Sequence, residues 1–319
     1  MAEYHPPYPV GGQAVIEGVM MRAKHTYAIA VKRPDGSITI KEDRLHTLAE
    51  RYPCLRWPFL RGPVILVESL IYGLKALSFS AQAAVDEEEE PLPPWSMALS
   101  ILVAIGLAIL FFGLLPHYLS GLAGRLWGAS LTVNNFTFHL IDGLLKIGFF
   151  LLYVWSISFV EEIRRVFEYH GAEHKSIFTF EAGEALTVEN ARKHQIWHPR
   201  CGTSFILVVL LISILIFTVL FPLLPVLQVG GWLTTNLVQV GIKILLMFPI
   251  AAISYEIIRL GGRHTRHPLC KLVLWPGLLT QRLTAREPSD EQLEVALEAL
   301  RAVVRKWKWW MAAAGSLPP

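Results

Sequence analysis

The sequence has little cysteine, and its cysteines do not form the pattern of a disulfide framework. The 319 residues include three cysteines, Cys54, Cys201 and Cys270, an odd number spread widely along the chain. Domains that depend on disulfides carry even sets of cysteines and fold in oxidising compartments. We therefore expect a protein whose cysteine side chains face a reducing compartment.

The N-terminus lacks the features of a secretion signal. Residues 1–12 contain proline, tyrosine and Glu3 where a signal peptide would carry basic residues and then an apolar stretch, so we expect an N-terminus that stays in the cytoplasm. The net charge of +3 is small, and no basic patch interleaved with aromatic residues occurs before the extreme C-terminus. These features argue against a nucleic-acid partner.

Apolar residues, in contrast, are abundant. They make up 53% of the chain, more than in a soluble domain, which predicts a membrane protein with the lipid bilayer as a partner. Four segments are long enough to cross about 30 Å of hydrocarbon. These predicted spans are residues 97–115, 138–160, 205–224 and 237–255.

The basic residues predict how these spans are oriented. The loops after the first and third spans contain one basic residue, Arg125, whereas residues 161–204 contain six. Loops rich in lysine and arginine stay in the cytoplasm. We therefore expect a multi-pass protein of the cell (inner) membrane, with both termini and residues 161–204 on the cytoplasmic side.

The region before the first span reads as a small β structure followed by a helix. Residues 27–33 and 37–41 flank Pro34-Asp35-Gly36, a turn sequence that predicts a β-hairpin. Residues 11–22 predict a third strand, with Glu17 on its solvated face or, as the alternative, serving as a site carboxylate. An apolar stripe interrupted by charges predicts an amphipathic helix over residues 59–85 that lies on the membrane or on the bundle.

The region after the last span predicts two further elements on the cytoplasmic side. Residues 269–279 are apolar but too short to cross, which favours an interfacial or re-entrant segment. Ser289 and Gln292 form a capping box at the start of an amphipathic helix. The basic end of that helix, which includes Trp307, fits a membrane-surface anchor, although a solvated tail is an alternative.

The expected fold is thus a mainly α membrane protein with four transmembrane helices, a small N-terminal β-hairpin region and cytoplasmic interfacial helices. The expected divisions are a cytoplasmic β region at 1–58, an amphipathic helix and acidic, proline-rich linker at 59–95, spans at 96–160, a cytoplasmic loop at 161–204, spans at 205–258, and a cytoplasmic interfacial segment with the C-terminal helix at 259–319.

The strongest chemical signal lies in the 161–204 loop. His170, Glu173 and His174 form the pattern H-x-x-E-H, and on a helix the two histidines share one face, with Cβ atoms about 5–6 Å apart. Two such imidazoles can bind one divalent metal, most plausibly zinc, while Glu173 acts as general base on a metal-activated water. The alternative is a pair of solvated histidines on a helix that leaves the membrane.

Further ligands follow in the sequence. His198 and Cys201 have the donor types of a zinc site, and Glu256 at the end of the fourth span is an alternative ligand. Three protein ligands would leave a position for catalysis, most plausibly hydrolysis of a substrate that the sequence does not specify. Four would close the site and favour a non-catalytic membrane scaffold with structural zinc. Both functions remain open at this point, as does homo-oligomer formation.

A second set of charged residues lies inside the predicted spans. Asp142 and Lys146 are four residues apart on the second span, and Lys243 lies on the fourth. A lone charge at the centre of a span costs about 2.5–3.5 kcal/mol, so we expect these side chains to pair with one another or to face the bundle interior. A role in ion or proton transport is the alternative, but the chain has no internal repeat that would support it.

Several stretches together resemble one family of bacterial membrane proteins, known as domain of unknown function 1385. These stretches are GGQAVIEGVMMR (11–22), YHGAEHK (169–175), LTVENARKHQIWHPRCGTSF (186–205) and PGLLTQRLTAREPSDEQLEVAL (276–297). The resemblance covers nearly the whole chain. Because members of that family are described as predicted metal-dependent enzymes, it implies the same role for His170, Glu173, His174, His198 and Cys201.

Overall fold

The structure, a computed structural model, describes residues 9–23, 25–85, 94–126, 135–223, 231–263 and 267–313. The acidic stretch that opens the predicted 86–95 linker lies outside these residues. The strands are β1 (Gly11–Val15), β2 (Gly18–Ala23), β3 (Thr26–Lys32) and β4 (Ile38–Arg44). The helices are α1 (Leu48–Arg51), η1 (Pro53–Arg56), α2 (Arg61–Ala83), α3 (Pro94–Ile109), η2 (Leu110–Leu114), α4 (Leu115–Leu126), α5 (Phe136–Ile157), α6 (Glu161–Glu181), α7 (Val188–Arg192), α8 (Gly202–Leu220), η3 (Phe221–Leu223), α9 (Trp232–Arg263), α10 (Pro268–Thr284) and α11 (Asp290–Ala313).

The four strands form one antiparallel sheet in the order β1-β2-β3-β4. The predicted hairpin is confirmed, because β3 pairs with β4 and Gly36 takes the left-handed conformation, with φ of 83°, that the turn requires. The predicted third strand is wrong as a single element. Residues 11–22 form two strands that reverse at Glu17, a residue with φ of 50°. The Glu17 carboxylate pairs with Arg165 of α6 and is therefore not on a solvated strand face.

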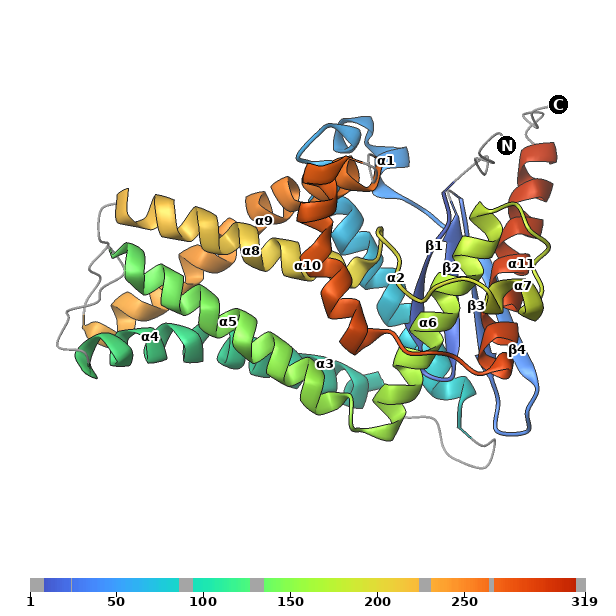
Figure 1. Cartoon of the computed structure of the whole chain (residues 1–319), viewed down its shortest axis with the longest axis horizontal. Coiled ribbons are helices and arrows are strands. Elements are labelled where there is room, and N and C mark those ends of the chain that lie inside the picture. Colours follow the sequence, from blue (N-terminus) through green and yellow to red (C-terminus); the bar gives the residue numbers. More distant parts are fainter. Residues whose placement is uncertain are drawn as a thin grey trace.

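Both faces of the sheet are covered, so the polar end of the molecule has three layers (Figure 1). Along β3, Ala28 and Ala30 point to one face and Ile29 points to the other, as the two-residue period of a strand demands. The first face packs against α6 and α11, and the second packs against α2 through Tyr72. This double burial explains why β2 and β3 contain almost continuous apolar residues.

The C-terminal helix α11 is part of this core. Leu293, Leu297 and Leu300 are almost completely buried against the sheet and α6, and Trp307 is 6% exposed within the same cluster. The expectation of a membrane-surface anchor is therefore wrong for Trp307, because its ring packs inside the protein. The capping box at the start of the helix is confirmed by hydrogen bonds between Ser289 and Gln292 in both directions.

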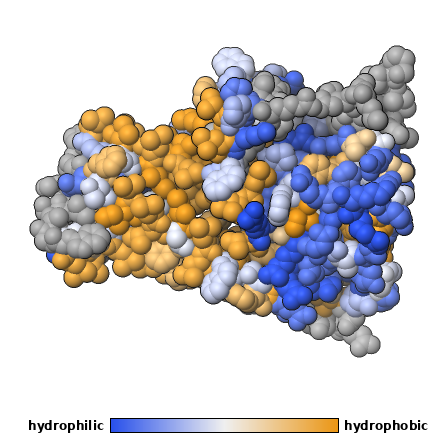
Figure 2. All heavy atoms as spheres, viewed as in Figure 1, coloured by the Kyte–Doolittle hydropathy of each residue, from blue (hydrophilic) through white to orange (hydrophobic). Residues whose placement is uncertain are grey.

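Five helical stretches among the described residues are long and apolar enough to cross a membrane. Four of them contain most of each predicted span, within α3–α4, α5, α8 and α9. The fifth is α2, which the sequence predicted to lie on the membrane or on the bundle. Figure 2 shows the long helices as an apolar half of the molecule and the sheet region as a mostly hydrophilic half. The chain thus has the composition and shape of a membrane protein with one polar domain.

Between the two halves lies α10, which is longer than the predicted 269–279 segment. It contacts α5, α8 and α9, and its approach to α8 is close because Gly277 faces Ser204, where a Cβ would overlap the serine side chain. The linker after α10 then crosses α6 on its way to α11 (Figure 1). This path brings the end of α10 to the histidines of α6.

The charged residues inside the long helices pair with one another, as predicted. Asp142 Oδ2 accepts hydrogen bonds from Lys146 Nζ at 2.8 Å and from Lys243 Nζ at 2.7 Å. All three side chains are buried, and Lys243 also lies 5.5 Å from the centre of the Phe138 ring. One carboxylate therefore serves two ammonium groups between α5 and α9.

Candidate metal centre

Helix α6 brings His170 and His174 together. Their ring centroids are 4.4 Å apart, which confirms the one-face arrangement that the four-residue spacing predicts. The face of α6 from Tyr169 to Thr179 is mostly buried, in contrast to its charged first turns. The two imidazoles therefore lie at the inner face of the polar domain and are not solvated side chains.

Backbone carbonyl groups orient both rings. His170 Nδ1 lies 2.7 Å from the carbonyl oxygen of Thr284, and His174 Nδ1 contacts the carbonyl oxygen of Ile196. A carbonyl only accepts, so each Nδ1 carries the proton and donates it, and each Nε2 keeps a free lone pair. This is the outer-shell arrangement that fixes metal-binding histidines elsewhere.

Cys201 supplies the third donor. Its Sγ atom lies 3.1 Å from His170 Nε2, and the ligand atoms of His170, His174 and Cys201 all lie within 4.8 Å of one another. His174 Nε2 is buried without a hydrogen-bond partner in the part of the chain that the structure describes. Burial also lowers the pKa of the His174 imidazole, which favours the neutral, metal-binding form. The donor set of two imidazoles and one thiol fits zinc.

His198 is close to this group but does not join it. Its ring centroid is 5.5 Å from that of His174, and its Nδ1 accepts a hydrogen bond from the backbone N–H of Arg200 at 3.3 Å. Burial lowers the pKa of His198 to about 4, so the ring is neutral and its proton sits on Nε2. That N–H lies 3.6 Å from Glu181 Oε2. Like His174 Nε2, His198 Nε2 is buried without a hydrogen-bond partner among the described residues, but it is not one of the three donor atoms that lie within 4.8 Å of one another.

Glu173 lies beside the two candidate ligand histidines, on the side of α6 that faces the sheet. Its carboxylate accepts a hydrogen bond from the backbone N–H of Gly12 in β1, and a Cβ on Gly12 would come within 2.7 Å of its Cγ. Burial raises the pKa of the Glu173 carboxyl, and the nearby His170, His198 and Arg22 oppose this shift. The site therefore contains a buried carboxyl group close to His170 and His198.

The alternative ligand Glu256 lies elsewhere. It accepts two hydrogen bonds from the Arg61 guanidinium and one from the backbone N–H of Phe59, where α9 meets the start of α2. Both carboxylate oxygens are used there. The structure thus brings together three of the sequence-predicted ligands with Glu173, places His198 next to them, and leaves Glu256 apart.

Sequence reasoning missed the residues that hold the site in place. The fully buried Gln281 side chain accepts from the His198 N–H at 2.8 Å and donates to the His198 carbonyl at 2.8 Å and to Ser204 Oγ at 2.9 Å. Gly171 lets the α10–α11 linker cross α6, because a Cβ there would overlap the carbonyl oxygen of Arg286. A glutamine within an apolar helix and a glycine between the two histidines were the available signals.

Comparison with known proteins places the chain among proteins of no assigned activity. A family described as "Protein of unknown function (DUF1385)" matches residues 57–306. The chain is 35% identical to "Uncharacterized protein YqhQ" of Bacillus subtilis (strain 168), over 96% of this chain and 95% of that protein. No solved structure matches the chain. The metal-centre residues from His170 to Cys201 all lie within the matched region.

Proposed function

The chain belongs to the DUF1385 family, and from its site we propose that it is an integral-membrane, metal-dependent enzyme, most simply a hydrolase. In this proposal His170, His174 and Cys201 hold a zinc ion. The observation that carries the proposal is the convergence of three donor atoms within 4.8 Å, with both ligand imidazoles oriented by backbone carbonyls.

The number of ligands favours catalysis over a purely structural role. Structural zinc sites close with four protein ligands, whereas catalytic sites use three and leave a position for water or substrate. Three donor atoms lie within 4.8 Å of one another, and His198 is not among them, so the geometry favours a set of three ligands. A zinc ion held in this way would polarise a substrate and lower the pKa of water.

Within this proposal Glu173 acts as the general base. Its carboxyl group is buried, adjoins His174 in the sequence and interacts electrostatically with His170 and His198. In its ionised form it can take a proton from water and return that proton to the leaving group. Gly12 leaves the space that this carboxylate fills and donates one hydrogen bond to it. His198, with Glu181 and Arg200 beyond it, closes the neighbouring side of the site.

The packing of the sheet supports four membrane crossings. Both α6 and α11 pack on the sheet, so the N-terminal strands, the metal centre and the C-terminal helix share one side of the membrane. An even number of crossings must then separate β4 from α6. Of the candidates in that interval, α2 touches the sheet through Tyr72 and Ser69, so α3–α4 and α5 cross. The basic residues of 161–204 favour the cytoplasm for this side of the membrane.

One substitution separates this function from its alternative, a membrane scaffold in which zinc only pins the 161–204 loop. Glu173→Gln should retain both the fold and bound zinc, and should fail to restore the growth or envelope phenotype of a strain that lacks the protein. The exposed Glu184→Gln serves as the matched control and should restore it. A Glu173→Gln protein that restores the phenotype as well as wild type would favour the scaffold.

A further inference from the structure

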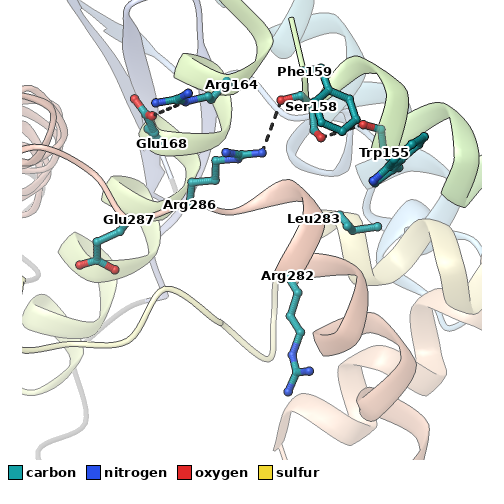
Figure 3. A pocket seen from close by; sticks show the side chains of 9 residues that line it. All are labelled: Trp155, Ser158, Phe159, Arg164, Glu168, Arg282, Leu283, Arg286 and Glu287. Atoms are coloured by element: carbon teal, nitrogen blue, oxygen red, sulfur yellow. Dashed lines mark hydrogen bonds and ion pairs between the residues drawn. The ribbon is translucent and has the colours of Figure 1, made fainter. Parts of the chain in front are cut away.

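Two neighbouring hollows at the boundary between the apolar and polar halves share one wall. The first, of about 620 Å³, lies between the end of α5, the start of α6 and the α10–α11 linker (Figure 3). The second, of about 760 Å³, runs between α5, α8 and α10. Both are lined by Trp155, Arg282 and Leu283. They therefore form one cleft with two chemically different ends, and each is of the size that binds small molecules.

The end along the long helices is almost entirely apolar. It is lined by Ile147, Leu151, Leu211 and Trp275, among other side chains of α5, α8 and α10. Helices α5 and α8 are both candidate membrane spans, so this end lies against hydrocarbon. Trp155 and Trp275 are 51% and 60% exposed, and tryptophans at such a boundary mark the level of lipid headgroups.

The other end is rich in arginine. Arg164, Arg282 and Arg286 line it, together with Glu168 and Glu287. Both acids already have partners: Glu168 accepts from Arg164 at 3.3 Å and from Gln292 at 3.0 Å, and Glu287 pairs with the buried Lys175. With Lys175 included, the cations exceed the carboxylates here by two, since three arginines and one lysine face two acids.

Two of the arginines at this end, Arg282 and Arg286, hold contacts that are not ion pairs. Arg286 donates to the Ser158 carbonyl at 3.4 Å, and Arg282 lies over the Trp197 ring at 5.5 Å. In Figure 3, dashed lines join Arg164 to Glu168 and Arg286 to Ser158, and none reaches Arg282. Guanidinium groups recognise phosphate by paired, charge-assisted hydrogen bonds. Arg282 is placed to offer such a pair.

We propose that this cleft binds one anionic glycerophospholipid, with an acyl chain in the apolar end and the phosphate at Arg282. Arg286, whose guanidinium points away from that of Arg282 in Figure 3, adds positive charge to the same end of the cleft. The excess of cationic side chains at one end of the cleft favours an anionic headgroup. The apolar end lies on two candidate membrane spans, which favours a lipid over a water-soluble phosphate ester. The site adjoins the metal centre, because Thr284, which orients His170, lies between the two arginines in sequence. The proposal does not depend on the metal being catalytic.

Native mass spectrometry of the full-length protein in detergent tests this proposal. The probes are phosphatidylglycerol, phosphatidylcholine and glycerol 3-phosphate, each titrated separately. We expect wild type to retain one phosphatidylglycerol at lower concentration than phosphatidylcholine, and glycerol 3-phosphate not to displace it. Arg282→Gln should weaken phosphatidylglycerol binding by about fivefold, as expected for one basic residue at an anionic headgroup. Arg282→Lys should keep the preference for phosphatidylglycerol.

Two further variants distinguish lipid binding in the cleft from a general effect of substitution on lipid binding. Leu211→Trp should fill the apolar end and reduce the binding of both lipids, whereas Arg305→Gln removes an exposed arginine on α11, away from the cleft, and should change neither. The proposal would be overturned if the wild-type protein retained the two lipids equally. It would also be overturned if both Arg282→Gln and Leu211→Trp bound phosphatidylglycerol as tightly as the wild-type protein does. Displacement of the lipid by glycerol 3-phosphate would overturn it in favour of a soluble phosphate ester.

Discussion

The Nε2 atom of His170 lies 3.1 Å from the Sγ atom of Cys201, although 31 residues separate them in the chain. In a tetrahedral zinc site, with Zn–N of about 2.1 Å and Zn–S of about 2.3 Å, the same two atoms would be about 3.6 Å apart. The folded chain therefore needs to open this pair by only a few tenths of an ångström to accept the ion. Preorganisation of this kind is what a metal site requires of its protein.

The ligand count can be tested at His198. Because its Nδ1 accepts a backbone hydrogen bond and its Nε2 faces Glu181, we predict that His198→Asn keeps bound zinc, while His174→Ala loses it. Zinc affinity measured by competition with a chromogenic chelator checks this. A loss of zinc by His198→Asn equal to that by His174→Ala would mean that four ligands bind, and the site would then be a structural one.

Gln281 should support both stability and metal affinity. Its side chain makes three hydrogen bonds to the His198 backbone and Ser204, so Gln281→Leu leaves buried polar groups unsatisfied, at about 1–3 kcal/mol each. We expect a lower melting temperature in detergent, followed by circular dichroism, and about tenfold weaker zinc binding. The exposed Gln195→Leu is the control and should behave as wild type.

Gly171 should be intolerant of substitution. An alanine there must push away the Arg286 carbonyl and with it the linker that follows Thr284, so we predict a destabilisation of about 1–3 kcal/mol and weaker zinc binding. The control is Gly148→Ala in α5, where nothing lies within 4 Å of the added Cβ. That change should be neutral or stabilising by up to about 1 kcal/mol. Equal melting temperatures for the two variants would contradict the close crossing at Gly171.

The Asp142 carboxylate should be essential for the stability of the helical half. Asp142→Asn leaves the Lys146 and Lys243 ammonium groups without their shared anion, which typically costs about 3–5 kcal/mol for a buried pair. Thermal unfolding in detergent should therefore start at a markedly lower temperature than for wild type. Adding Lys243→Met to this variant should recover part of the loss. A single variant as stable as wild type would show that water reaches these groups.

The features that the sequence predicted correctly are those with a local cause. Apolar length located four of the five membrane-length helices, and Pro34-Asp35-Gly36 located the β3–β4 turn. The spacing of His170 and His174 placed them on one face before any tertiary contact was known. Each of these follows from the geometry of one element alone.

The remaining features depend on contacts between distant segments. The chain reverses at Glu17, just before Gly18, and Arg165 of α6, which is distant in the sequence, binds the Glu17 carboxylate there. In the sequence alone, the apolar face of α11 is like that of a helix on a membrane surface. Its contact with the sheet is known only from the structure. Similarly, the position of His198 beside the three candidate ligands depends on its hydrogen bonds to Gln281 of α10, and no spacing rule reveals these contacts.

The most direct test of the central claim is the metal content of the purified full-length protein, measured by inductively coupled plasma mass spectrometry for wild type and for Cys201→Ser. Our account predicts about one zinc ion per chain in wild type and well under half of that in Cys201→Ser, with both proteins folded. Wild-type protein without a stoichiometric transition metal, after purification in the absence of chelators, would contradict it.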